Sequence, residues 1–298
     1  CFPIFPPASS SLPISLLHGV WATMPATAAF ALSKLTDTPF SMGAHAYDVF
    51  REGGDWILGL KFDSASFIRT SSLSTAKRIK ELGVHQDKVK LIRRGLAYWP
   101  TRAGFELVNN ERLEMVSVGR LVEKKGYFNQ LIIANRLNDM GIPFRLRIVG
   151  SGPLKKELYL ERERLGLREK VEFLGSLDQE CIRECYITSD IFLFTGVVAR
   201  NGDRDGIPNV IPEAMSAGCL ILSSCFAGAS EAFIEDVSGF SFNPFESKEW
   251  VHLLSEFWKS PRSFERIRRS AIQYAKDSFN ITRTANSISD AIIAGSKR

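Results

Sequence analysis

The chain is poor in the residues that mark disulfide-rich, metal-binding or membrane-spanning proteins. It has only five cysteines, an odd number without any Cys-x-x-Cys pair, so we expect reduced thiols of the cytosolic kind rather than a disulfide framework. Cys181 and Cys185 stand four residues apart but have no accompanying His or Cys set, which argues against a zinc site. No apolar run approaches the roughly 20 residues that span a bilayer, so a transmembrane helix is not expected.

Basic residues are numerous, but they do not gather into long runs. The net charge is +5 and the isoelectric point about 8.9, and we do not expect a nucleic acid partner from so dispersed a charge. A mildly basic face that approaches anionic lipid or a phosphorylated substrate is at least as consistent with this composition.

Strands and helices alternate in two regions. In the first, strands are predicted at residues 39–45, 66–70 and 89–92, with helices at 24–35 and 74–82, and a linker follows at about 98–110. In the second, strands are predicted at 113–118, 144–149, 171–174, 191–194 and 220–223, with helices at 127–140, 154–165, 179–188 and 209–217. This rhythm predicts parallel, doubly wound sheets in a two-lobed α/β protein with a cleft between the lobes.

The two regions suggest how the chain is divided. We predict an acceptor-side lobe at 1–105, a donor lobe at 106–275 and a C-terminal helix at 276–298 that packs back toward the first lobe. The chain has no initiator methionine, residues 1–7 do not resemble a signal peptide, and the first lobe is short. We therefore expect a fragment whose first lobe is incomplete at its beginning.

The loop after the strand at 113–118 contains two cations between glycines. Arg120 and Lys125 lie between Gly119 and Gly126, where the backbone can approach a ligand closely. Arginine offers bidentate contacts and lysine a compact charge, which suits a diphosphate. An ordinary solvated loop with surface charges explains the same residues equally well.

The loop at 195–209 leads into the predicted helix through Pro208, a residue that fits the start of a helix. The free N–H groups of that helix start suit an anion. Asp205 precedes the helix and Glu213 lies eight positions further on, so both carboxylates could face one ligand through its hydroxyls. Alternatively, Asp205 caps the helix and Glu213 is a residue at the edge of the core.

Together these motifs resemble the retaining glycosyltransferases of family 4, which have the GT-B fold of two Rossmann-like lobes that face a cleft. The resemblance is carried by Gly119-Arg120 with Lys125, and by Asp205-Gly206-Ile207-Pro208-Asn209 leading to Glu213. It extends to the sequence Ala44-His45-Ala46-Tyr47-Asp48 of the first lobe. The stretch 201–208 is similar to the branch that builds bacterial exopolysaccharides such as colanic acid and amylovoran.

The resemblance implies a function for each matching residue. Arg120 and Lys125 hold the donor diphosphate, Glu213 holds the ribose hydroxyls, Asp205 touches the donor sugar in place of the family's usual Glu, and His45 lies near the transferred sugar. Catalytic residues are thus expected to be His45, Arg120, Lys125 and Asp205. Donor binding is expected at Gly119, Arg120, Lys125, Gly150, Leu174, Gly175, Asp205, Gly206, Ile207, Pro208, Asn209, Val210 and Glu213.

Two segments depart from the family pattern. Ser230 stands where the family often has Pro in a Gly-x-Pro-Glu turn, which weakens a donor contact for Glu231. Residues 93–97 read Arg-Arg-Gly-Leu-Ala instead of an Asn-Gly-Val-Asp ending, and no chemistry is assigned to them.

The resemblance implies a hexosyltransferase that moves a sugar from a nucleotide-sugar to a glycan or polyprenyl-linked glycan acceptor with retention of configuration. It implies no cofactor and no metal, and a cytoplasmic protein that contacts the inner membrane peripherally. A nucleotide-sugar epimerase on the same fold and an inactive or binding-only remnant are the alternative interpretations.

Overall fold

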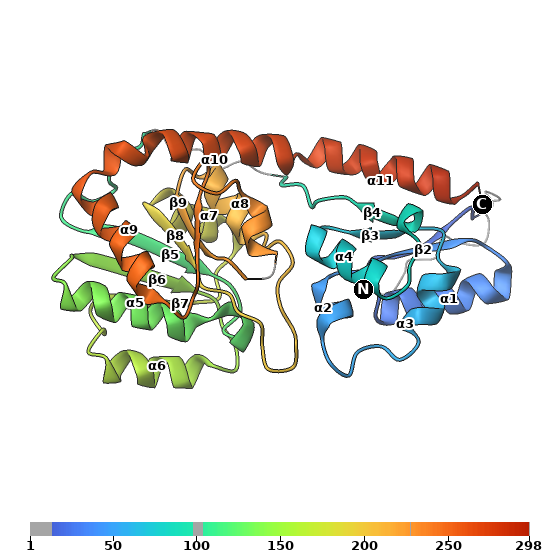
Figure 1. Cartoon of the computed structure of the whole chain (residues 1–298), viewed down its shortest axis with the longest axis horizontal. Coiled ribbons are helices and arrows are strands. Elements are labelled where there is room, and N and C mark those ends of the chain that lie inside the picture. The colour runs from blue at the N-terminus through green and yellow to red at the C-terminus, as the bar shows by residue number, and fades with distance from the viewer. Residues whose placement is uncertain (1–13, 98–103, 227, 298) are drawn as a thin grey trace.

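The computed structural model describes residues 14–97, 104–226 and 228–297, where two separate parallel sheets with flanking helices form two lobes (Figure 1). The predicted α/β architecture is confirmed. Residues 98–103 of the expected linker lie outside the described residues. Among the residues described, no helix is both long and apolar enough to cross a bilayer.

The first lobe is built on a four-stranded sheet. The strands occur in the order in which they follow one another in the chain, and all neighbours are parallel. Their carboxyl ends therefore meet at one edge, which is where α/β sheets bind ligands. The elements are β1 (Leu17–Gly19), α1 (Met24–Thr36), β2 (Phe40–Gly43), α2 (Ala46–Phe50), α3 (Leu58–Ser64), β3 (Ile68–Thr70), α4 (Leu73–Glu81) and β4 (Val89–Leu91).

The second lobe holds a six-stranded parallel sheet in the order β10-β9-β8-β5-β6-β7. The chain runs outward from β5 in one direction through β6 and β7, and in the other through β8, β9 and β10. The strands are β5 (Leu113–Val118), β6 (Phe144–Val149), β7 (Val171–Gly175), β8 (Ile191–Phe194), β9 (Leu220–Ser224) and β10 (Phe240–Phe242). The helices are α5 (Tyr127–Asp139), α6 (Lys155–Arg164), α7 (Gln179–Ile187), α8 (Val210–Ser216), α9 (Ser247–Lys259) and α10 (Glu265–Ser278).

Apolar side chains on both faces of the central strands bury this second sheet. Every residue of β5 is buried, as expected for a parallel strand covered by helices on both sides. Trp250 and Leu254 of α9 pack into the core on one face, and Met215 of α8 packs into the core on the other.

The last helix, α11 (Ile281–Gly295), lies along the first lobe (Figure 1). Asn280 caps it through a side-chain oxygen that accepts from the Thr282 and Arg283 N–H groups. Ile288 and Ile292 pack against a small cluster that contains Phe67 and Ile92 of the first lobe. Residues 276–278 belong to α10 rather than to this helix, and the domain limits at 105 and 275 stay predictions.

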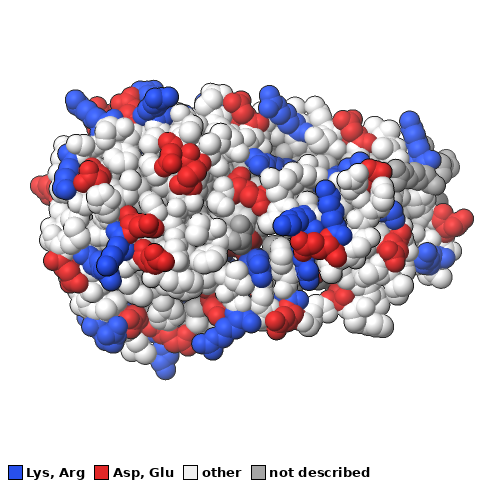
Figure 2. Space-filling model, viewed as in Figure 1, with Lys and Arg blue, Asp and Glu red and all other residues white. Residues whose placement is uncertain are grey.

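Charges of both signs are interspersed over both lobes on the face shown in Figure 2. This view shows no single basic area of the kind that a nucleic acid backbone binds.

Candidate functional site

The strand order of the second sheet reverses between β5 and β8, which are hydrogen-bonded neighbours. The carboxyl edge of the sheet at such a reversal is the usual ligand position in open α/β sheets. The loops that leave β5 and β8 are those at 119–126 and 195–209, the same two that the sequence singled out. The topology thus supports their interpretation as a ligand site.

Close backbone contacts hold the two loops together. Gly126 has φ +66° and lies so near Thr195 that a Cβ on Gly126 would overlap the Thr195 carbonyl. The Thr195 hydroxyl donates to the Gly126 carbonyl at 2.8 Å, and the Tyr127 hydroxyl donates to the Gly119 carbonyl at 2.9 Å. The loop that carries Arg120 and Lys125 is therefore fixed against the end of β8.

Lysines of the first loop pair with aspartates of the second. Lys125 Nζ lies 2.6 Å from Asp205 Oδ2, while Lys124 Nζ lies 3.1 Å from Asp203 Oδ1 and 3.5 Å from Asp205 Oδ1. Arg120 lines the same cavity of about 440 Å³. The predicted diphosphate cations and the predicted sugar-contacting acid are thus brought together, with Asp205 bound to Lys125.

His45 faces these residues from the first lobe. It precedes α2, its N–H donates to Asp48 Oδ2 at 2.7 Å, and its ring contacts Trp21 edge-on. Burial, together with the positive charge of Arg69 and Arg94, lowers the pKa of His45 to about 4, so the imidazole is neutral at pH 7. A cavity of about 340 Å³ brings the ring together with residues of the opposite lobe, namely Asp205, Gly206, Ile207 and Asn209.

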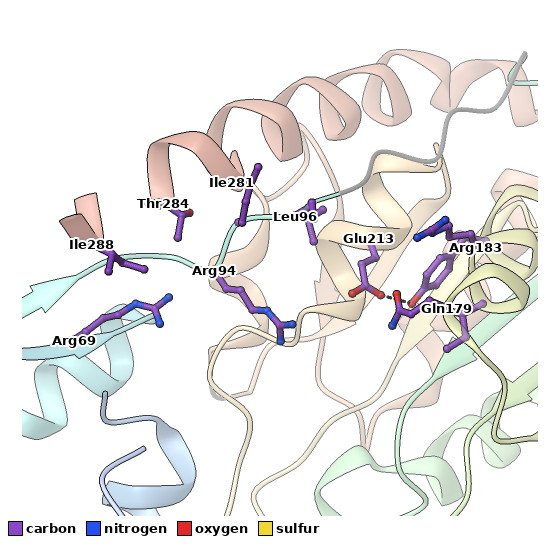
Figure 3. Close-up of a pocket in the computed structure, with 13 residues that line it drawn as sticks. Arg69, Arg94, Leu96, Gln179, Arg183, Glu213, Ile281, Thr284 and Ile288 are labelled. Atoms are coloured by element: carbon purple, nitrogen blue, oxygen red, sulfur yellow. Dashed lines mark hydrogen bonds between the residues drawn. The ribbon is translucent and has the colours of Figure 1, made fainter. Parts of the chain in front are cut away.

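Glu213 lines another cavity, of about 460 Å³, between α7, α8 and α11 (Figure 3). The Tyr186 hydroxyl lies 3.1 Å from Glu213 Oε2 and donates to it. Burial raises the pKa of Glu213, and this effect is opposed by the hydrogen bond from Tyr186 and the charges of Arg94 and Arg183. A half-buried carboxylate with one oxygen held in place is suited to accept hydrogen bonds from ligand hydroxyls.

Five of the expected donor-binding residues line none of these three cavities. Gly150 instead stands behind Gly119, and a Cβ there would overlap the Gly119 carbonyl, so its contribution is to the shape of the loop. The set comprises Gly150, Leu174, Gly175, Pro208 and Val210.

Two arginines that the sequence left without an assignment lie in the cleft. Arg69 on β3 and Arg94 beyond β4 each line both the His45 cavity and the Glu213 cavity. Both lie at or just past the carboxyl ends of parallel strands. A position at the carboxyl end of a parallel strand is itself an indication of a ligand contact. Arg94 was nevertheless left without an assignment, because residues 93–97 depart from the family pattern.

Glu231 also contacts the opposite lobe. Its two carboxylate oxygens accept hydrogen bonds from the Leu73 and Ser74 N–H groups at 2.5 and 2.8 Å. These are the first N–H groups of α4, which lack partners within the helix. The structure therefore gives Glu231 a contact between the lobes.

The described residues contain no cluster of three or more His, Cys, Asp or Glu side chains that could hold a metal ion. The aspartates nearest to such an arrangement, Asp203 and Asp205, are engaged by lysines. The expectation that no metal is required stays a prediction.

Comparison with known proteins gives concordant matches. The family model described as Glycosyl transferases group 1 matches residues 103–277. WcaL of Escherichia coli strain K12, described as a colanic acid biosynthesis glycosyltransferase, is 30% identical over 184 residues, which are 61% of this chain and 45% of that protein. The amylovoran biosynthesis glycosyltransferase AmsK of Erwinia amylovora is 31% identical over 160 residues, 53% of this chain and 39% of that protein. These matches span less than half of the length of either relative.

Solved structures share the fold of most of this chain, including both lobes. Anabaena HepE in complex with UDP has a TM-score of 0.74 at 19% identity, over 91% of this chain and 76% of that one. The sucrose-phosphate synthase of Thermosynechococcus elongatus has a TM-score of 0.77 at 16% identity, over 93% of this chain and 72% of that one. At these identities the likeness establishes the fold.

Proposed function

Because the chain belongs to the family of group 1 glycosyl transferases, we propose that it transfers a sugar from a nucleotide-sugar donor to a glycan acceptor in polysaccharide biosynthesis. The observation that carries this proposal is the meeting of Arg120, Lys125 and Asp205 in one cavity at the point where the strand order reverses. Its relatives of 30 and 31% identity are described as exopolysaccharide glycosyltransferases, which favours the same class of product.

The proposed donor lies across the second lobe. Arg120 and Lys125 bind the diphosphate and stabilise it as the leaving group, a preorganised electrostatic contribution to catalysis. Glu213, held by Tyr186, accepts hydrogen bonds from the ribose hydroxyls. The HepE structures were obtained with UDP and with UDP-glucose, so UDP is a suitable first probe for this chain.

We propose that transfer occurs with retention and without a metal ion. The neutral His45 lies on the acceptor side of the cleft. There its ring can accept a hydrogen bond from the transferred sugar or donate one to it. The two donor-site cations take the place of a metal at the diphosphate. Chelation with EDTA should therefore leave sugar transfer unchanged, and loss of transfer that Mg²⁺ or Mn²⁺ restores would contradict metal independence.

The acceptor is proposed to be a glycan or a polyprenyl-linked glycan that the protein meets at the cytoplasmic face of the membrane. Support comes from strongly exposed apolar residues of the first lobe, among them Trp56 (94% exposed) and Leu60 on the neighbouring α3. Sedimentation with vesicles that contain anionic lipid should carry the protein down, and Trp56→Ala should reduce the bound fraction. Equal sedimentation of both proteins would remove this support.

The direct test is nucleotide binding and turnover in donor-site variants. Arg120→Ala and Glu213→Ala should each weaken UDP binding by about ten-fold or more, since each removes a contact that involves a charged group. Both should lose turnover of a UDP-sugar, whereas Glu235→Ala, outside the three cavities, should behave as the wild type. Full activity in either donor-site variant would sink the assignment, and product formed from the donor alone would indicate an epimerase.

A further inference from the structure

Two arginines extend from neighbouring strands of the first sheet into the cleft. Arg69 lies on β3, and Arg94 follows β4, which pairs with β3 in parallel register through Ile68↔Val89. Figure 3 shows the Arg94 side chain between Arg69 of the first lobe and Glu213 of the second. Both arginines line the His45 cavity and the Glu213 cavity, so they stand where the two cavities adjoin.

Within residues 14–97, 104–226 and 228–297, no acid forms an ion pair with either guanidinium group. Among the described residues, neither makes a hydrogen bond or an ion pair, and Arg69 Nε is a buried donor without an acceptor. Burial, and then the charge of Arg94, lowers the pKa of Arg69. Holding two like charges partly out of water is unfavourable unless an anion compensates them.

The acids that line the two cavities are already engaged. Asp205 is paired with Lys125 and Lys124, and Glu213 accepts from the Tyr186 hydroxyl. Glu213 lies within electrostatic reach of Arg94, but no hydrogen bond joins them. The capacity of Arg69 and Arg94 to bind an oxyanion is therefore left for a ligand.

The two arginines are distinct from the cations of the donor site. Arg120 and Lys125 extend from the second lobe and line a third cavity that contains neither Arg69 nor Arg94. Arg69 and Arg94 lie on the first lobe and line the His45 cavity and the Glu213 cavity. A ligand held by them would approach the donor sugar from the opposite side.

We propose that Arg69 and Arg94 form an anion-binding subsite that recognises a phosphate or carboxylate group of the acceptor. The identification of this ligand as the acceptor rests on the glycosyltransferase function proposed above. The binding of an anion by the two arginines does not depend on it. Two guanidinium forks can bind such a group through bidentate hydrogen bonds, which selects a charged acceptor over a neutral sugar of the same shape.

The test is calorimetric titration of the 298-residue chain with glucose 6-phosphate, glucuronic acid, neutral glucose and UDP. The two charged sugars should bind at least about ten-fold more tightly than glucose. Arg69→Gln and Arg94→Gln should each abolish about ten-fold of that advantage, while UDP affinity falls by much less than in Arg120→Gln. Arg120→Gln should weaken the binding of UDP and leave the binding of the charged sugars unchanged.

Lys90→Gln is the matched control, because it removes one positive charge from an exposed residue that pairs with Arg69 in register. It should change neither affinity. Arg69→Lys keeps the charge, so it should retain most of the anion affinity; if Arg69→Gln fails to fold, Arg94→Gln and this lysine variant still decide the matter.

Three outcomes would overturn the subsite. Unchanged binding of the charged sugars in both glutamine variants would show that these arginines bind no ligand. An equal loss for glucose would show that shape rather than charge is recognised. A loss of UDP affinity as large as in Arg120→Gln would assign the arginines to the donor diphosphate.

Failure of the wild type to bind UDP would contradict the proposed function, while the comparison of charged with neutral sugars would still test the subsite.

Discussion

His45 is surrounded by features that disfavour its charged form. It is half-buried, and Arg69 and Arg94 contribute positive charge from the adjoining strands. A neutral imidazole beside the proposed sugar site can form hydrogen bonds without attracting the proposed diphosphate away from Arg120 and Lys125. His45 can thus contact a sugar through hydrogen bonds and does not compete with Arg120 and Lys125 for an anionic ligand.

This environment predicts a dependence of stability on pH. Because the folded pKa of about 4 lies below the value of 6.5 for the unfolded chain, the unfolded chain binds the proton first as pH falls. The stability associated with neutral His45 is fully present above pH 6.5 and is lost between pH 6.5 and 4. Urea unfolding at several pH values should show the wild type losing about 3 kcal/mol more than His45→Asn over this range.

The exposed His85 offers a control, and His85→Asn should follow the wild-type curve. Parallel curves for the wild type and His45→Asn would show that His45 is not held neutral in the folded protein.

Asp205 competes with the proposed diphosphate for Lys125, to which it is bound at 2.6 Å. Replacing it with Asn should raise UDP affinity by about three- to ten-fold, since one anion is removed from the phosphate site. Sugar transfer should fall at the same time if the carboxylate contacts the donor sugar. Calorimetry and turnover measured on the same preparation separate the two effects.

Asp203→Asn is the companion variant, because Asp203 pairs with Lys124 instead. It should change UDP affinity less than Asp205→Asn does. A weaker UDP complex in Asp205→Asn would contradict competition for Lys125.

Among the elements, the loop between β5 and α5 depends on backbone geometry at Gly126 as well as on side-chain contacts. Gly126 adopts a left-handed conformation and touches the Thr195 carbonyl, which brings the start of α5 close to the end of β8. A residue with a Cβ would have to push the start of α5 away from Thr195. The sequence marked this glycine as permissive, but only the structure identifies what it touches.

A pair of glycines with the same conformation isolates this effect. Gly126 has φ +66° and Gly141 φ +68°, but a Cβ on Gly141 meets no atom within 4 Å. Gly141→Ala should cost about 1 kcal/mol of unfolding free energy from conformation alone. Gly126→Ala should cost about 1–3 kcal/mol more through overlap with Thr195, and should also weaken UDP binding. Equal costs by urea unfolding would contradict the close packing of the two loops.

Most helices and strands of the second lobe agree with their predicted positions to within about two residues, a margin usual at element ends. The six-residue strands β5 and β6 were predicted correctly because their buried apolar residues form a pattern that is typical of strands. Short elements such as β10, α2 and α3 were not predicted, because three to seven residues hold too little periodicity to separate them from loops. The longer helices α9 and α10 were not predicted either.

At the scale of the whole molecule, the lobes touch on both sides of the cleft. The loop at 195–209 reaches the first lobe, where the Asn201 carbonyl accepts from the Glu52 N–H at 2.8 Å and Arg204 lies over the Phe50 ring. Glu231 caps α4, and on the other side the Leu96 N–H donates to the Phe279 carbonyl at 2.7 Å. The described residues thus join the lobes through polar contacts beside the cleft, in addition to the apolar packing of α11 on the first lobe.

Glu231→Ala tests whether its carboxylate holds the lobes together. The variant leaves the first N–H groups of α4 without their acceptors, so hydrogen exchange at Leu73 and Ser74 should accelerate by about ten-fold or more. Small-angle scattering should report a larger radius of gyration. Glu235→Ala is the control, since Glu235 binds Ser241 within its own lobe. Unchanged exchange at Leu73 and Ser74 would contradict the contact.

The sequence by itself determined the alternation of helices and strands, and hence the parallel sheets and the two loops that carry Arg120, Lys125 and Asp205. These features follow from local patterns of apolar residues, glycine and charge. Only the tertiary structure decided that Lys125 binds Asp205, that Glu231 reaches across to α4, and that Arg69 and Arg94 meet between two cavities. Those pairs lie 25 to 158 positions apart, and no local pattern encodes which strand ends adjoin once the sheets and lobes have packed.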